Sequence, residues 1–248
     1  VIFTFGQSNS ANYVVPLADT KIPKNLLQYD WNTKSCYEYK EPLLGTNGEN
    51  GNVITYAAKQ IAQNTNKKVV IIPFGVSGSS ILDWAYGPLS HLNQIVLNGL
   101  KENSLYPQVF LWHQGESDSR LNNADPKKMI NSPNFSLDRS IRLGLSYKDY
   151  KNSLQILVDQ TKEYFPESFF GIALTSRCNS KEWDPVRKAQ ADIVKENFKT
   201  FISVDSDKVY FKNFRYDNCH FTSIGAKKIS EDFYKSITQK INFKVIKD

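Results

Sequence analysis

The stretch K-V-V-I-I-P-F at residues 68–74 decides the fold class of this chain. Its apolar residues follow one another without polar alternation, which is typical of a strand buried on both faces, as in a parallel sheet. Apolar residues at helical spacing precede it over residues 52–63, and a second helical pattern follows it around residues 90–101. A buried strand between two helices predicts an α/β fold.

The same alternation extends outward to both ends of the sequence. We predict four further strands, at residues 1–5, 108–112, 169–174 and 201–204. We predict three further helices, at residues 150–165, 185–198 and 223–241. Strands separated by helices in this way predict a three-layer α/β/α sandwich with a flavodoxin-like five-stranded parallel sheet. Residues 26–31 and 36–39 could form a hairpin outside this series.

Length and composition favour one globular domain. The 248 residues are 40% hydrophobic and 13% aromatic, which is enough to bury a sizeable core without metals or disulfides. We therefore expect a single domain over residues 1–248. Residues 119–146 are rich in Asn and Pro and match no regular pattern, so we expect a loop insertion there.

Charge and hydropathy indicate which classes of partner the protein could bind. The formal charge is +6, but no recognisable nucleic-acid-binding motif accompanies it, so we expect no nucleic-acid partner. No apolar run approaches the roughly 20 residues that a membrane-spanning helix needs. The sequence starts at Val1 inside an apolar run and without Met, which leaves room for a signal peptide upstream. The compartment stays open, with export or the periplasm favoured, and the oligomeric state stays open as well.

The chain has three cysteines, Cys36, Cys178 and Cys219. Their number is odd and their spacing is unlike that of a metal site, so they suggest neither a disulfide framework nor bound zinc. Whether any of them are paired stays open.

Polar clusters follow the ends of the predicted strands, and in a parallel sheet those loops share the edge where ligands bind. Ser8 lies in the first of them, in G-Q-S-N-S at residues 6–10. Such a turn can present a nucleophilic hydroxyl together with free backbone N–H groups, the two requirements of acyl transfer. The alternative is an ordinary turn serine. The motif differs from the G-x-S-x-G nucleophile elbow.

A nucleophilic serine needs a base, and the sequence offers three histidines. His220 stands in D-N-C-H before the last helix, and Asp217 precedes it by three residues. One tight turn could therefore set the carboxylate against the imidazole, as in a catalytic triad. His91 lies at a predicted helix start, where a structural or exposed role is expected. His113 directly follows the third strand of the sheet, where we expect a supporting role.

Four blocks occur along the chain in a fixed order: Gly6-Gln7-Ser8-Asn9; Gly78-Ser79-Ser80-Ile81 followed by Trp84; Trp112-His113-Gln114-Gly115-Glu116-Ser117-Asp118; and Asp217-Asn218-Cys219-His220-Phe221-Thr222 with Gly225-Ala226 beyond. With these blocks the sequence resembles the SGNH hydrolases, and within them the carbohydrate acetylesterases of the sialate O-acetylesterase type. The blocks span nearly the whole chain.

The resemblance implies an SGNH hydrolase fold and a role for each matched residue. Ser8 would be the nucleophile, His220 the general base and acid, and Asp217 the residue that orients it. The oxyanion hole would consist of the Ser8 N–H, the Gly78 N–H and the Gln114 side-chain amide. The alternative for Gln114 is a buried amide that ties loops together.

Four further residues are candidates for support or substrate contact: Asn9, Trp84, His113 and Glu116. Trp84 is either a platform for stacking a sugar or a core residue. Glu116 and Asp118 are expected to brace their loop through backbone hydrogen bonds. Together with His113 they could be taken for a metal site or a glycosidase carboxylate pair, but H-x-x-E lacks the second histidine of a zincin motif. We expect no metal and no cofactor.

The function we infer from these blocks is that of a serine esterase that removes O-acetyl groups from a carbohydrate, such as a sialic acid or an acetylated polysaccharide. One rival is a carbohydrate O-acetyltransferase with the same acyl-enzyme, since only the acceptor differs. Another is a non-catalytic carbohydrate-binding module, which the presence of all four expected site residues argues against: Ser8, Gln114, Asp217 and His220. A lipase is a weaker option, because no apolar lid-like helix is evident.

Overall fold

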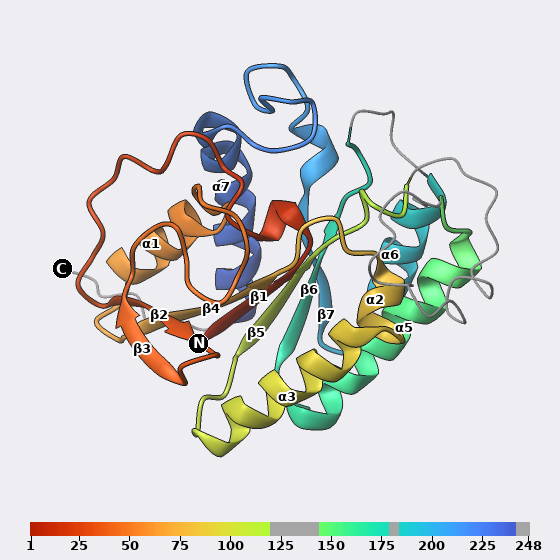
Figure 1. Ribbon diagram of the computed structural model, residues 1–248, viewed down its shortest axis with the longest axis horizontal. Coiled ribbons are helices and arrows are strands. Elements are labelled where there is room, and N and C mark those ends of the chain that lie inside the picture. The colour runs from red at the N-terminus through yellow and green to blue at the C-terminus, as the bar shows by residue number, and fades with distance from the viewer. Residues whose placement is uncertain (120–143, 179–183, 242–248) are drawn as a thin grey trace.

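A seven-stranded sheet forms the centre of the computed structural model, which describes residues 1–119, 144–178 and 184–241 (Figure 1). The strand order is β3-β2-β4-β1-β5-β6-β7. The strands are β1 (Ile2–Gly6), β2 (Leu26–Asp30), β3 (Ser35–Glu38), β4 (Val69–Gly75), β5 (Val109–His113), β6 (Phe169–Leu174) and β7 (Thr200–Asp205). All neighbouring pairs are parallel except β2 with β3.

The predicted parallel sheet is confirmed, but the predicted count of five strands is wrong. The five predicted strands are β1, β4, β5, β6 and β7, and the hairpin of β2 and β3 joins them at the β4 edge. The hairpin was expected only as a possibility outside the sheet, and it was not counted as part of the sheet because β3 lies at the edge with its residues largely exposed. An exposed edge strand carries no continuous apolar run, whereas every residue of β4 is buried.

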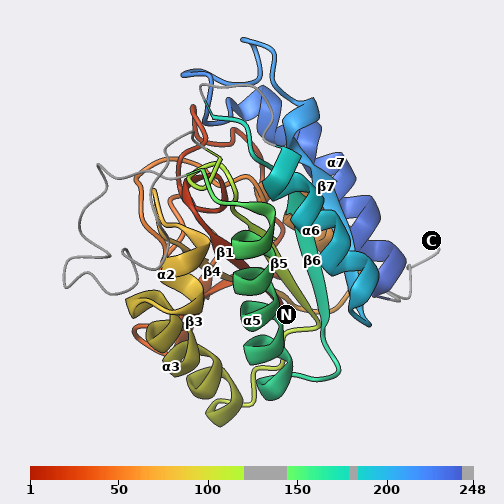
Figure 2. The same cartoon turned by 90° about the vertical axis from the view of Figure 1, so that its right-hand side faces the viewer.

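Helices cover both faces of the sheet (Figures 1 and 2). On one face lie α1 (Thr55–Gln63) and α7 (Ser223–Lys240), which pack against each other. On the other face lie α2 (Ile81–Ala85), α3 (Pro88–Glu102), α5 (Tyr147–Tyr164) and α6 (Asp184–Glu196). The short α2 was not predicted, because five residues are too few to show a helical period. Within the described residues, no helix combines the length and the apolar character that crossing a membrane requires.

The order of the strands creates a topological switch point at β1. From β1 the chain goes to β4 on one side and later to β5 on the other, so Gly6 at the end of β1 pairs with Gly75 and with His113. Gly6 has φ +134°, and a Cβ there would lie 2.3 Å from the carbonyl oxygen of His113. Only glycine allows this close turn out of the strand. In sheets of this kind ligands bind beyond the carboxyl ends of the strands at the switch point.

The predicted loop insertion at 119–146 lies for the most part outside the described residues. Its two ends meet: Ser119 and Gly144 form an antiparallel bridge, and the Leu145 N–H donates to the carbonyl of Asp118 at 2.7 Å. The chain therefore leaves and rejoins the fold at nearly the same point, just before α5.

Candidate active site

Three side chains form a continuous hydrogen-bonded chain at the switch point. Ser8 opens a single 3₁₀ turn, Ser8–Ser10, directly after β1. His220 comes from the loop between β7 and α7, and its Nε2 lies 2.9 Å from the Ser8 Oγ. Its Nδ1 lies 2.6 Å from Oδ2 of Asp217. The structure thus brings together Ser8, His220 and Asp217, which stand at opposite ends of the sequence.

A tight turn holds Asp217 against the imidazole, as its spacing from His220 predicts. The second carboxylate oxygen, Oδ1, accepts hydrogen bonds from the backbone N–H groups of Cys219 (2.9 Å) and His220 (2.7 Å). Burial opposes ionisation of this carboxyl, but the hydrogen bonds from His220 and Cys219 outweigh it and hold the Asp217 pKa below its usual value. An ionised Asp217 accepts a hydrogen bond from the Nδ1–H of the imidazole, which leaves Nε2 unprotonated and able to accept the Ser8 proton.

Two tyrosines stack on the His220 ring. The Tyr13 ring lies 5.1 Å away, centroid to centroid, with an interplanar angle of 23°. The Tyr216 ring lies 5.9 Å away at 26°. Tyr216 is 46% exposed and stands at the rim of the site. These contacts restrict the tilt of the imidazole without forming hydrogen bonds to it.

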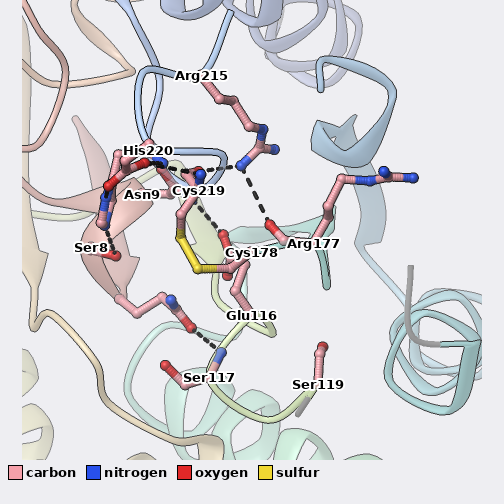
Figure 3. Close-up of a disulfide and its surroundings, with 12 residues drawn as sticks. Ser8, Asn9, Glu116, Ser117, Ser119, Arg177, Cys178, Arg215, Cys219 and His220 are labelled. Carbon is pink, nitrogen blue, oxygen red and sulfur yellow. Dashed lines mark hydrogen bonds and ion pairs between the residues drawn. A yellow bond between two sulfur atoms is a disulfide. The ribbon is translucent and has the colours of Figure 1, made fainter. Parts of the chain in front are cut away.

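A disulfide between Cys178 and Cys219 ties the loop of His220 to the loop that follows β6 (Figure 3). The sequence pattern did not suggest it, because 41 residues separate the two cysteines and only the fold brings them together. Cys36 is free and exposed. The backbone carbonyl of Cys219 also accepts a hydrogen bond from the Asn9 side chain at 3.2 Å. The loop of the base is therefore fastened to the turn of the nucleophile as well as to β6.

Arg215 supports the same loop from inside the protein (Figure 3). Its side chain is almost fully buried and donates to four backbone carbonyls, those of Arg177, Ser206, Val209 and Cys219. Its guanidinium carbon lies 4.2 Å from the centroid of the Phe221 ring. The sequence analysis missed this residue, because an arginine in a lysine-rich segment resembles solvated surface charge. Its place two residues before Asp217 is the only signal of its role.

A pocket of about 140 Å³ opens beside the Ser8 hydroxyl. Ten residues line it: Gln7, Ser8, Ser77, Gly78, Glu116, Ser117, Cys178, Asp217, Cys219 and His220. Gly78 has φ +73°, a conformation that favours glycine. Within the described residues, the backbone N–H groups of Ser8 and Gly78 donate to no other group. Two backbone donors are therefore available beside the nucleophile.

The Gln114 side chain does not reach this pocket, which contradicts its predicted place in the oxyanion hole. It is fully buried, and its Nε2 donates to the Ser79 carbonyl (3.2 Å) and to Oδ2 of Asp118 (2.7 Å). Its Oε1 accepts a hydrogen bond from the Tyr150 hydroxyl at 3.1 Å. Both amide hydrogens are engaged, so no donor remains for a substrate. Gln114 follows the alternative interpretation, a buried amide that ties loops together.

Asp118 braces the loop as expected, and Glu116 does so by a different route. Asp118 accepts hydrogen bonds from the Ser80 hydroxyl (2.5 Å) and the Ile81 N–H (2.7 Å), as well as from Gln114. Burial raises the pKa of its carboxyl to about 7. Glu116 accepts a hydrogen bond from the Asn9 side-chain amide at 2.7 Å rather than from backbone. Asn9 therefore joins the nucleophile turn to the Glu116 loop.

The other candidates lie away from the pocket. Trp84 is fully buried and packs edge-on against Phe5, Phe74 and Trp112, so it is a core residue rather than a platform for sugars. His113 is 2% exposed and does not line the pocket, which favours a supporting position over contact with a substrate. His91 is exposed on α3.

The described part of the chain contains no cluster of three or more His, Cys, Asp or Glu side chains that could hold a metal ion. Glu116 and Asp118 would supply the carboxylates of a metal site or of a glycosidase pair. In the structure the two side chains have different hydrogen-bond partners. Asp118 is occupied by donors from α2 and its cap, whereas Glu116 lines the pocket. This arrangement supports neither a metal site nor a glycosidase carboxylate pair.

A known protein family matches this chain over nearly its whole length. A family model described as "Carbohydrate esterase, sialic acid-specific acetylesterase" matches residues 1–239. The sequence has no significant match among curated proteins.

Solved structures share the fold at low sequence identity. A protein from Arabidopsis thaliana is similar with a TM-score of 0.72 and 18% identity, with 98% of each chain covered. A GDSL-like lipase from Parabacteroides merdae gives 0.61 and 14%, covering 97% of this chain and 95% of that one. A carbohydrate acetylesterase from Sinorhizobium meliloti gives 0.54 and 11%, covering 97% and 99%. The sandwich is thus the fold of GDSL-like hydrolases, as the resemblance implied.

Proposed function

The chain belongs to the carbohydrate esterase family of sialic acid-specific acetylesterases, and we propose that it removes O-acetyl groups from a sugar through an acetyl-serine intermediate on Ser8. The observation that carries this proposal is the hydrogen-bonded chain from Ser8 through His220 to Asp217 at the wall of a pocket. Family membership makes the protein a carboxylic ester hydrolase acting on acetylated carbohydrate. The geometry supports a covalent route for that hydrolysis.

In the first half of the proposed reaction, the Ser8 Oγ attacks the carbonyl carbon of the acetyl ester while its proton passes to Nε2 of His220. The carbonyl π electrons move onto oxygen, and the oxyanion accepts hydrogen bonds from the Ser8 and Gly78 N–H groups. Collapse of this tetrahedral intermediate breaks the bond to the sugar oxygen, which takes the proton from His220 as it leaves. Asp217 stays ionised and stabilises the transient imidazolium.

In the second half, water replaces the sugar. His220 accepts a proton from the water as its oxygen attacks the acetyl-serine carbonyl, and the same two N–H groups stabilise the second oxyanion. Collapse releases acetic acid, which ionises to acetate, and the proton held by His220 returns to Ser8. The same imidazole thus serves as base and acid in each half-reaction.

The surroundings of the pocket support a sugar ester as substrate. The pocket itself is small and suits an acetyl group, so the sugar would lie at its mouth. Exposed aromatic rings stand in the loop that leads to Asp217: Tyr210, Phe211 and Tyr216 are between 44% and 57% exposed. Aromatic faces with one side in solvent suit stacking against sugar rings. We propose an O-acetylated sialic acid or an acetylated polysaccharide as the substrate.

Substitution of the nucleophile tests this proposal. Ser8→Ala and His220→Ala should each abolish most acetate release from O-acetyl sialic acid, acetylated xylan and an aryl acetate, while the melting temperature stays near that of the wild type. The double variant should be little worse than either single variant, because triad residues act as a unit.

A matched control lies in the same turn. The Ser10 hydroxyl donates to the Gln7 carbonyl at 2.7 Å and does not line the pocket. Ser10→Ala should therefore retain activity and still react at Ser8 with a serine-directed fluorophosphonate. Full activity in Ser8→Ala, or labelling at another residue, would refute the acetyl-serine route.

A further inference from the structure

The side chain of Gln7 is buried at the wall of the pocket. Gln7 connects β1 to the Ser8 turn, its side chain is only 2% exposed, and it lines the pocket beside Ser8 and Gly78. Its backbone N–H donates to the His113 carbonyl at 3.2 Å, which fixes the start of the side chain against the end of β5. The side chain is thus held at its base before any contact of its amide is considered.

The amide group of Gln7 has a fixed orientation. Its Oε1 accepts hydrogen bonds from the backbone N–H groups of Ser117 at 3.0 Å and Gly115 at 3.5 Å. Rotation of the amide by half a turn would set its NH₂ group against those same N–H donors, so the oxygen must stay where it is. Nε2 is consequently held on the opposite side of the group.

That nitrogen has no partner of its own. Within the described residues the Gln7 Nε2 donates to no protein group, whereas the corresponding nitrogen of Gln114 donates twice. The nitrogen is not among the fully enclosed side-chain atoms that lack a partner, so it borders the open space of the pocket that Gln7 lines. Such a donor gains a partner when an acceptor enters the pocket.

We propose that the Gln7 Nε2 is the third donor of the oxyanion hole, together with the Ser8 and Gly78 N–H groups. This inference rests on the proposed acetyl-serine route. The two hydrogen bonds to Oε1 hold the donor in place before the reaction, so it need not reorganise as charge develops on the acetyl oxygen. Gln7 thereby takes the role that the sequence pattern gave to Gln114.

Gln7→Glu is the sharpest test, because it keeps the oxygen that Ser117 and Gly115 require and removes the NH₂ donor. We expect kcat on an aryl acetate to fall by about 10²–10³-fold with a much smaller change in KM, as for loss of one oxyanion donor. The melting temperature should stay close to the wild-type value. If Gln7→Glu does not fold, Gln7→Met, which has a similar length and no donor, carries the test.

Gln114→Ala provides the comparison. It should lower the melting temperature, because Asp118 and the Ser79 carbonyl lose a donor, and leave kcat of the folded enzyme near that of the wild type. A folded Gln7→Glu variant with wild-type kcat would overturn the assignment, and so would a rise in KM at unchanged kcat, which marks ground-state binding. Activity in Ser8→Ala would instead refute the acetyl-serine route itself, so the two failures are distinguishable.

Discussion

Two histidines near the catalytic pocket differ in what surrounds them. Asp217, Ser8 and two tyrosines contact His220. The His113 ring packs against Phe221 and Phe233, and the Oε1 atom of Glu116 lies 3.9 Å from its Nε2. Neither ring nitrogen has a hydrogen-bond partner within the described part of the chain. Burial, together with the nearby charge of Arg215, lowers the His113 pKa to about 3. The His113 imidazole in the folded protein is therefore neutral well above pH 3.

This environment makes His113 a source of acid sensitivity. Its pKa falls from 6.5 in its ordinary state to about 3 in the folded protein, so between these values the unfolded chain binds one proton more. The stability that neutral His113 contributes is complete above pH 6.5 and is lost progressively as the pH falls toward 3. Each pH unit in that window costs about 1.4 kcal/mol per proton.

His113→Phe should remove this dependence, since a phenyl ring suits the contacts with Phe221 and Phe233. Denaturant unfolding of the variant and the wild type, at pH 6.5 and at about pH 4, gives the comparison. The variant should lose less stability on acidification, because all other titrating groups are common to both proteins. Equal losses in the two proteins would show that His113 is protonated in the fold.

At the scale of elements, the site is built from loops that the sheet brings together and that cross-links then hold. The loop between β7 and α7 carries His220 and Asp217. The Cys178–Cys219 disulfide, the Asn9 side chain and a backbone bridge to Val15 tie it to other parts of the fold, and the buried Arg215 braces it from within. The disulfide joins this loop to β6, a strand that contributes no residue to the triad. Its loss should affect both stability and the geometry of the base.

Replacement of both cysteines tests this role. The Cys178→Ser/Cys219→Ser variant should lose roughly 4 kcal/mol of unfolding free energy, the value expected for a cross-link across 41 residues. It should also lose kcat, because His220 is adjacent to Cys219 in the chain. Denaturant unfolding and aryl acetate kinetics measure the two effects, and Cys36→Ser, which removes the exposed free cysteine, is the control. An unchanged unfolding midpoint in the double variant would exclude a stabilising disulfide.

The elements differ in how far sequence patterns could predict them. β4 and β5 are short apolar runs buried along their length, so hydrophobic patterning located both within a residue or two. The edge strand β3 is largely exposed and was expected only as part of a possible hairpin, whereas α2 is mostly buried but has too few residues to show a helical period. An element is therefore predictable from the sequence where an apolar pattern is both buried and long enough to show its period.

The residues of the site follow a similar rule. Ser8, Asp217 and His220 lie in short local motifs whose spacing already implies the turn, and the structure places them in contact. The positions of the Gln114 and Gln7 amides depend on hydrogen-bond partners from other parts of the fold. The local sequence does not specify these partners. The disulfide and the buried Arg215 depend on the same long-range assembly.

At the scale of the whole molecule, one topological feature explains where the chemistry lies. The chain reverses its direction across the sheet at β1, which leaves the Ser8 turn between the ends of β4 and β5. Residues from the start, the middle and the end of the sequence meet there because parallel strands bring their carboxyl ends to one edge. The fold thereby places Ser8, Gly78 and His220, for which we propose the roles of nucleophile, oxyanion donor and base, around a single pocket.

The central claim is that Ser8 carries the acetyl group during the reaction, and a rapid acid quench tests it most directly. The enzyme is mixed with excess aryl acetate, quenched within the first turnover and digested, and the peptides are examined by mass spectrometry. We predict the mass increase of one acetyl group on the peptide that contains Ser8, a matching burst of the aryl product, and neither signal in Ser8→Ala. Acetate release by the wild type with no acetylated Ser8 and no burst, and with activity retained in Ser8→Ala, would contradict the account.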